Sequence, residues 1–297
     1  MQVAYESVLV GLFTIMTGKW SASGCGENRT GEWVRMRAET ASCCQLAQPS
    51  SPYEHGCRRQ DEVFVGFSRD GFHWYRPVVE GRHQPFLRMD RTIVRKPSDW
   101  KWNKAMVQSV GGGFTVSAAS GAPMRFYASG RTGIDQIIGF PEPSGTGIAS
   151  TGVAELRRDG FAAVGAAGSG AAVLVTRPIV FDREKAWLFV NAEHADEMVM
   201  SVLDAAHGRS LPGLAEADYR GTGKTASGDR LAVSWATGAD ALRVVAGRAV
   251  RLSVRFTSGR ARLFAFWVSV DGCGASGGWV AAGGVGFNAS RDLRGSC

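Results

Sequence analysis

The carboxylates best suited to catalysis lie in or beside apolar segments. Glu6 falls within the apolar residues 3–16, and strand alternation places its side chain on the face of Val8 and Leu12. A carboxyl group on an apolar strand face is desolvated, which raises its pKa and suits a general acid. Two structural interpretations stay open, a buried Glu bonded to a structural partner and a frayed terminal residue.

A second and weaker catalytic candidate is Glu62. It follows Asp61 at the start of a predicted strand over residues 62–68, and a strand end can face a pocket. The alternative is a solvated strand start.

Aromatic and amide side chains gather farther along the chain. Trp100 and Trp102 provide flat apolar faces, and Asn103 and Gln108 provide amide groups. Sugars are bound by such sets, in which aromatic platforms carry a few placed polar groups. We therefore expect these four residues to bind a sugar, with core tryptophans beneath a loop as the alternative.

Several familiar sites do not fit the spacing. Residues 221–225 resemble a phosphate-binding loop, but Asp218 stands where a Walker A loop needs its first glycine. The five histidines form no pair with metal-ligand spacing on one face, and no Gly-x-Ser-x-Gly elbow occurs. The prediction is a protein with no metal site and no cofactor.

Residues 68–74, Ser-Arg-Asp-Gly-Phe-His-Trp, form a motif that holds a turn. An Asp side chain in a turn accepts backbone N–H groups, and the motif resembles a shortened Asp-box of β-propellers. We therefore expect Asp70 to be structural. Arg-Asp-Gly-Phe recurs at 158–161, which favours a repeated strand–turn–strand unit. The alternative is that Asp-Gly is simply a common hairpin turn.

The elements that must position these residues are predicted to be short strands. The sequence has 39 glycines and few windows typical of amphipathic helices. In the first half we expect strands at 3–16, 62–68, 72–75, about 105–118, about 123–130 and 151–157, and long loops at 18–60 and 78–104.

The second half has the spacing of a β-sandwich. Its strands are expected at 172–176, 179–181, 187–191, 198–203, 231–235, 249–256 and 263–268. We place the domain boundary near 165–171, in a stretch of Gly, Ala and Ser, and a glycine-rich tail at 271–297.

Charge and cysteine content limit the partners. The net charge is +7, but the arginines are scattered, so we expect no nucleic-acid partner. The apolar run 8–16 is too short to span a bilayer and no secretory signal precedes it, so we expect no membrane partner and leave the compartment open. Four of the six cysteines fall in 18–60 without zinc spacing, and both disulfides and free thiols stay open.

Several segments, taken in order, resemble a known family. Residues 4–13, 65–74, 107–113 and 126–131 look like consecutive pieces of a five-bladed β-propeller in proteins related to glycoside hydrolase families 32 and 43. Residues 174–178, 188–191 and 262–267 look like the β-sandwich that follows it. The resemblance covers about 1–17 and 61–270.

The resemblance implies an all-β chain that corresponds to the C-terminal part of such a protein. A partial propeller would occupy 1–165, with the Cys-rich insertion at 18–60, and the sandwich would occupy 171–270. Exposed sheet edges would then favour self-association.

The resemblance also implies a chemistry. In the family, carboxylates around the propeller axis hydrolyse O-glycosidic bonds, and Glu6 matches the general acid by position. The family's early Asp has no counterpart in this chain, so missing blades would leave it inactive. The alternative function is a non-catalytic carbohydrate-binding or structural β module.

Overall fold

The computed structural model is an all-β protein, as predicted. It describes residues 2–6, 8–16, 61–79, 81–89, 102–103, 106–111, 113–115, 121–131, 149–168, 170–223 and 225–276. Over these ranges the only helices are three short 3-10 segments, η4 (Ala195–Glu197), η5 (Glu216–Asp218) and η6 (Ala241–Val245). The insertion at 18–60, Trp100 and residues 277–297 of the predicted tail lie outside the described residues.

The chain divides into two compact units. Unit 1 comprises Met1–Ala4, Leu9–Phe114 and Arg125–Ala154, and unit 2 comprises Tyr5–Val8, Thr115–Met124 and Glu155–Cys297. The domain boundary near 165–171 stays a prediction.

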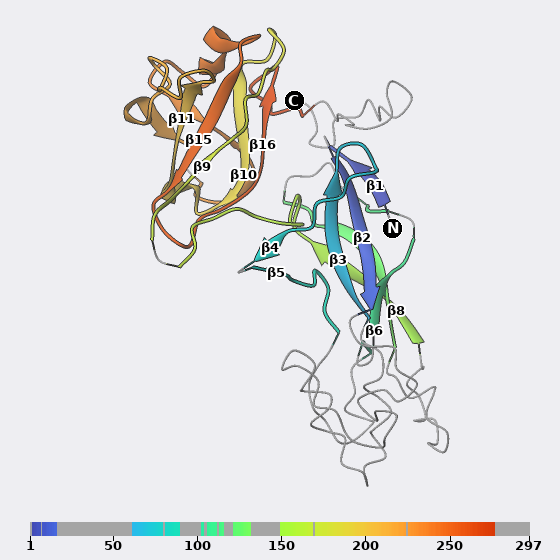
Figure 1. Ribbon diagram of the computed structural model, residues 1–297. Coiled ribbons are helices and arrows are strands. Elements are labelled where there is room, and N and C mark those ends of the chain that lie inside the picture. The colour runs from blue at the N-terminus through green and yellow to red at the C-terminus, as the bar shows by residue number, and fades with distance from the viewer. Residues whose placement is uncertain are drawn as a thin grey trace, which may run out of the picture. The chain divides into compact units, whose positions relative to one another are not determined.

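A six-stranded open sheet, mostly in unit 1, has the order β1-β2-β3-β6-β7-β8 (Figure 1). Its strands are β1 (Gln2–Tyr5), β2 (Val8–Met16), β3 (Asp61–Ser68), β6 (Met106–Ser109), β7 (Met124–Arg131) and β8 (Ala149–Leu156). β2 and β3 pair antiparallel over eight residue pairs, from Leu9↔Ser68 to Met16↔Asp61. A parallel pair, Asp61↔Met106, joins β3 to β6, and β6 pairs antiparallel with β7. Two antiparallel pairs, β2–β3 and β6–β7, thus meet at a parallel pairing.

Apolar alternation explains these strands. Val10 and Leu12 of β2 are buried, and β3 is buried along nearly its whole length. In β7 the buried Phe126 and Ala128 alternate with the exposed Tyr127, as in a strand with one face on a core. The strands predicted at 62–68, 123–130 and 151–157 are confirmed as β3, β7 and β8, whereas the strand predicted at about 105–118 is reduced to β6.

The continuous strand predicted over 3–16 is wrong, because the chain turns at Glu6. Glu6 has a left-handed backbone with φ of 48°, which ends β1 before β2 begins. The preceding Tyr5 is buried, and its hydroxyl donates a hydrogen bond to Asp159. Glu6 therefore does not alternate onto the face of Val8 and Leu12.

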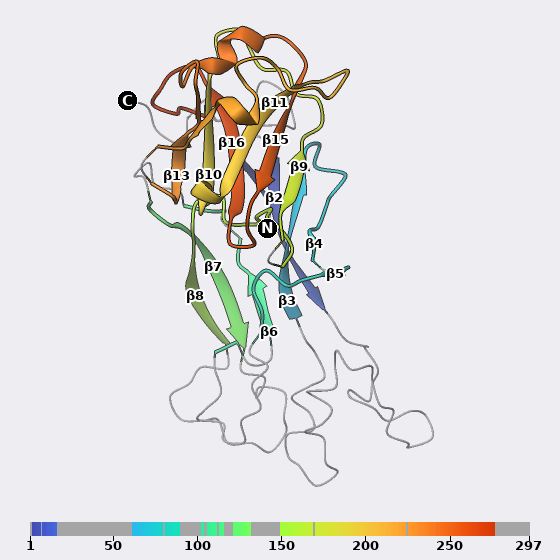
Figure 2. The same ribbon diagram turned by 90° about the vertical axis from the view of Figure 1, so that its left-hand side faces the viewer.

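Unit 2 contains two three-stranded antiparallel sheets that share one hydrophobic core (Figure 2). One sheet is β13 (Gly228–Ala232), β10 (Trp187–Glu193) and β16 (Arg262–Ser269), and the other is β11 (Met198–Asp204), β15 (Val250–Phe256) and β9 (Ala172–Val175). Val190 from the first sheet and Met200 and Val254 from the second are fully buried in that core.

Two predicted strands of unit 2 differ from the structure. Residues 179–181 contribute only one bridge, Ile179↔Val250, beside Pro178, which has no N–H to donate. The strand predicted at 231–235 is divided between β13 and β14 (Ser234–Trp235), and β14 pairs with β12 (Tyr219–Gly221).

Candidate functional site

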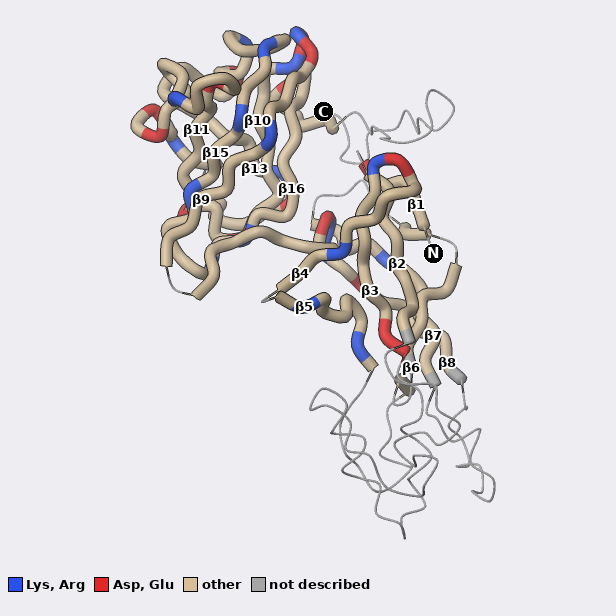
Figure 3. The backbone as a smooth tube through the Cα atoms, in the orientation of Figure 1, with Lys and Arg blue, Asp and Glu red and all other residues tan. Residues whose placement is uncertain are grey.

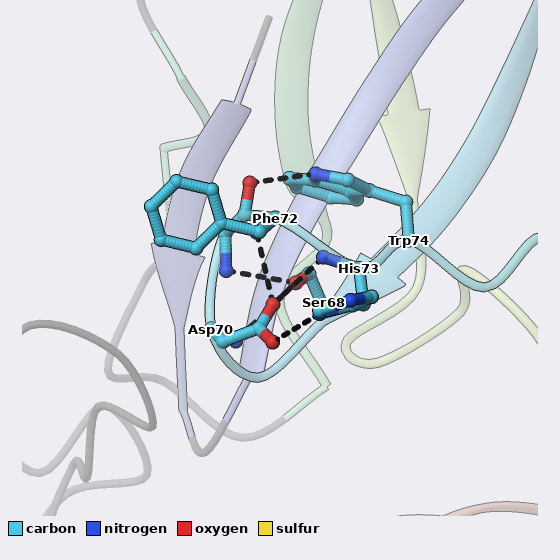
Figure 4. Close-up of polar contacts among 6 residues, drawn as sticks. Ser68, Asp70, Phe72, His73 and Trp74 are labelled. Carbon is cyan, nitrogen blue, oxygen red and sulfur yellow. Dashed lines mark hydrogen bonds and ion pairs between the residues drawn. The ribbon is translucent and has the colours of Figure 1, made fainter.

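The turn after β3 is built around the carboxylate of Asp70 (Figure 4). The backbone N–H groups of Phe72 and His73 donate to Asp70 Oδ1 at 2.9 and 2.8 Å, and His73 Nδ1 lies 2.7 Å from Oδ2. Ser68 Oγ accepts the N–H of Gly71 at 2.9 Å. The predicted structural role of Asp70, as an acceptor of backbone N–H groups, is confirmed.

Trp74 closes this turn. Its Nε1 donates to the carbonyl oxygen of Gly71 at 3.0 Å, and its ring meets the ring of Phe13 edge-on at 4.9 Å. The paired Gly11 and Gly66 make room for these rings, because a Cβ on Gly11 would stand 2.4 Å from the Phe13 ring and 2.7 Å from Trp74. Glycines on β2 and β3 thus hold the tryptophan over its turn.

The two-residue hairpin with a returning strand at 72–75 is wrong. The amides of Phe72 and His73 donate to Asp70 and so cannot extend the ladder. Of residues 72–75, only Tyr75 pairs with β3, opposite Phe67. The turn is wider than Asp-Gly alone predicts because the Asp side chain organises it.

We expect Asp70→Ala to open this turn. Hydrogen bonds hold the pKa of the Asp70 carboxyl well below its usual range. The backbone N–H of His73 makes the largest contribution, and the N–H of Phe72 adds to it. Because this pKa is lowered, the turn is stabilised above the ordinary carboxyl pKa and loses that stabilisation as the pH falls towards the folded pKa. Hydrogen exchange at the Phe72 and His73 amides should accelerate in the variant at neutral pH.

Asp70→Asn is the matched control for this prediction, since it keeps one acceptor oxygen without the charge. It should retain part of the protection of both amides. Equal protection of the two amides in the parent protein and in Asp70→Ala would contradict the role given to the carboxylate.

The second Arg-Asp-Gly-Phe segment serves a different purpose. Asp159 has φ of 57° and is buried, whereas Asp70 is exposed. Its Oδ1 accepts the Tyr5 hydroxyl at 2.7 Å and its Oδ2 accepts Asn191 Nδ2 at 2.8 Å. Asp70 thus organises its own turn, while Asp159 connects segments far apart in the sequence.

Asn191 of β10 is the centre of a buried polar network in unit 2. Its Nδ2 also donates to the carbonyl oxygen of Arg158 at 2.8 Å, and its Oδ1 accepts Arg157 at 2.6 Å. Arg157 also binds Glu193 at 2.7 Å and lies 3.8 Å from the centre of the Phe264 ring. Both Asp159 oxygens already accept side-chain donors in a buried setting, so this arrangement suits a cross-link between strands.

Sequence reasoning missed this network. The only signal was Asn191 itself, a polar residue at the end of the apolar run 187–191. A buried polar residue needs partners, but the run does not identify Asp159 or Arg157 as those partners.

The two predicted catalytic carboxylates fall in different units. Glu6 lies in the turn between β1 and β2 in unit 2 and is half-buried. Glu62 belongs to unit 1 and is 1% exposed, so the alternative of a solvated strand start is wrong. Asp61 is buried too, but successive strand residues face opposite sides of a sheet. Asp61 and Glu62 therefore do not form a carboxylate pair on one face.

The predicted sugar-binding residues divide between two faces of the sheet in unit 1. The Trp102 ring lies over Gly130 of β7, where an added Cβ would stand 2.3 Å from it, and Trp102 is 39% exposed. Gln108 pairs with Ser129, the next residue along β7, and so faces the other side. Asn103 Nδ2 donates to the carbonyl oxygen of Arg88 at 3.0 Å. Trp102 and Asn103 therefore stay together as neighbours, and Gln108 lies apart from them.

The described residues form no metal-binding cluster, and the chain matches no known protein. Among the described residues there is no group of three or more His, Cys, Asp or Glu that could hold a metal ion, and no helix long and apolar enough to span a membrane. Comparison with protein-family models, curated proteins and solved structures finds no match.

Proposed function

We propose that this chain is a carbohydrate-active β protein on the plan of glycoside hydrolase families 32 and 43, with a partial propeller followed by a sandwich. The observation that carries the proposal is the turn at 68–74, in which Asp70 accepts two backbone amides and Trp74 closes the turn, as an Asp-box would. Two sheets around one core in unit 2 support the sandwich part.

The proposed reaction is hydrolysis of an O-glycosidic bond by paired carboxylates. Glu6 would protonate the leaving-group oxygen, and its half-buried place in a turn supports that role, because a turn presents a side chain at the end of a sheet. Glu62, which lies in unit 1, stays a separate and weaker catalytic candidate and is not paired with Glu6.

Glu6→Gln tests the hydrolysis. The chain would be assayed on a panel of aryl glycosides, and loss of a general acid should lower kcat by about 100-fold or more. Glu184→Gln, at an exposed turn, is the matched control and should leave the rate unchanged. Hydrolysis that survives Glu6→Gln would remove Glu6 from the mechanism, and no hydrolysis of any glycoside would remove the enzymatic proposal.

A second candidate, glycan binding without turnover, is favoured by Trp102. Its partly exposed ring rests on Gly130, which fixes a flat apolar surface beside an amide. Trp102→Ala should weaken binding on a glycan array and in calorimetry by about tenfold or more, since a stacking aromatic contributes about 1 kcal/mol or more. Tyr127→Ala, which removes an exposed aromatic from the opposite face of β7, should leave binding intact.

A further inference from the structure

The chain after the Asp70 turn forms a strap along the edge of β3 that β2 does not occupy. The strap comprises residues 75–79 and 81–88. It is attached to β3 at two points, Tyr75 opposite Phe67 and Leu87 opposite Val63. Between these points β4 (Val78–Val79) pairs with β5 (Arg82–His83), and Figure 1 shows this small hairpin projecting from the sheet.

The turn and the strap expose large apolar side chains on a fixed backbone. Phe72 is 88% exposed although its own N–H is bound by Asp70, and Tyr75 is 65% exposed although its backbone pairs with β3. Val78 and Val79 on the hairpin are also exposed. Exposed apolar groups gathered in one segment mark a binding surface.

The same segment carries a net positive charge, with basic positions spread along its backbone (Figure 3). Residues 69–88 include four arginines against two acidic residues, Asp70 and Glu80, which gives a net charge of +2, and the Asp70 carboxylate is engaged in its own turn. Arg88 is exposed and donates to the neutral amide oxygen of Gln84 at 2.8 Å. Arg82 at the hairpin is exposed too. An anionic partner complements this charge.

Trp102, the proposed sugar-stacking residue, lies beside the end of the strap. The Asn103 side chain binds the carbonyl oxygen of Arg88, so the exposed Trp102 ring is anchored beside the end of the strap. Arginines that bind carboxylates or sulfates then lie in one segment with aromatic faces that stack on sugar rings.

We propose that the turn and strap bind an acidic polysaccharide, a sugar chain with carboxylate or sulfate groups, through Arg82, Arg88, Phe72 and Trp102. This inference rests on the proposed carbohydrate function and adds the charge class of the glycan.

Polygalacturonate oligosaccharides and the same oligosaccharides fully methyl-esterified are the probes, because esterification removes the charge and keeps the sugar. Binding of the full chain would be measured by calorimetry. We expect the acidic form to bind at least about tenfold more tightly than the ester and to weaken steeply with added salt. Arg82→Gln combined with Arg88→Gln should remove most of that preference, and Phe72→Ala should weaken both forms.

Arg177→Gln combined with Arg209→Gln, two exposed arginines of unit 2, is the matched control and should leave binding unchanged. Equal loss in this control, or equal affinity for acid and ester, would overturn the inference. Equally tight binding of single-stranded oligo-dT through Arg82 and Arg88 would also overturn it, since the surface would then bind any polyanion. Trp102-dependent binding of neutral glycans alone would reject the acidic class and keep the proposed function, whereas binding to no glycan would reject both.

Discussion

Asn191→Leu is expected to destabilise the protein by about 3 to 5 kcal/mol. The amide of Asn191 binds Asp159, the Arg158 carbonyl oxygen and Arg157, and it is completely buried. A leucine of similar size fills the space but leaves a carboxylate, a carbonyl group and a guanidinium without this partner. Hydrogen bonds to charged groups contribute about 1.5 to 3 kcal/mol each, so two such losses account for most of the effect.

Urea denaturation gives the free energy of unfolding for this comparison. Tyr5→Phe is the matched variant, because it removes only the hydroxyl that donates to Asp159 and should cost about 1 to 2 kcal/mol. A change of less than about 1 kcal/mol for Asn191→Leu would mean that the network contributes little to stability.

The parts of the fold that sequence predicts well are those determined by local patterns. β3 and β10 follow from apolar runs bounded by polar residues, and both are almost entirely buried. The Asp70 turn was predictable because Ser68, Asp70 and Trp74 act within seven residues of one another. A local motif carries all of its own partners.

The parts that sequence did not predict depend on distant partners. The turn at Glu6 follows Tyr5, whose hydroxyl binds Asp159, a partner 154 residues away. The second Arg-Asp-Gly-Phe segment looks like the first, yet its aspartate binds Asn191 of β10. Similarly, the separation of Trp102 from Gln108 depends on how β6 pairs with β7. Tertiary pairing, and not residue type, decides these positions.

The candidate site was predicted as a set of residue types without its geometry. Trp102 and Asn103 are adjacent in sequence and stay neighbours, so that part needed no tertiary information. Glu62 was interpreted from its place at a strand start, where solvent is a reasonable expectation, but β3 is buried from its first residue. β3 pairs with β2, from which it is separated by 44 residues of sequence, 17–60, so its local sequence does not reveal this environment.

Tyr219 is expected to make the protein sensitive to alkaline pH. Its hydroxyl is buried with no hydrogen-bond partner among the described residues, and its ring packs edge-on at 6.4 Å from Trp235. Burial raises the pKa of Tyr219 to about 12 from an ordinary value of 10.0. A raised pKa favours the folded state below pH 10.0, and that contribution is lost as the pH rises from 10.0 towards about 12.

Two pH units at about 1.4 kcal/mol each give a loss of up to about 3 kcal/mol across this range. Tyr219→Phe removes the ionisable group, so its unfolding free energy should fall less steeply above about pH 10 and should equal or exceed that of the parent at pH 7, because the unpartnered hydroxyl is gone. Urea denaturation at about pH 7, 10 and 11.5 measures both effects.

Tyr127→Phe, at an exposed position on β7, should follow the parent curve, since an exposed phenol ionises alike in the folded and unfolded chain. Parallel curves for the parent and Tyr219→Phe would show that the phenol reaches water in the folded protein.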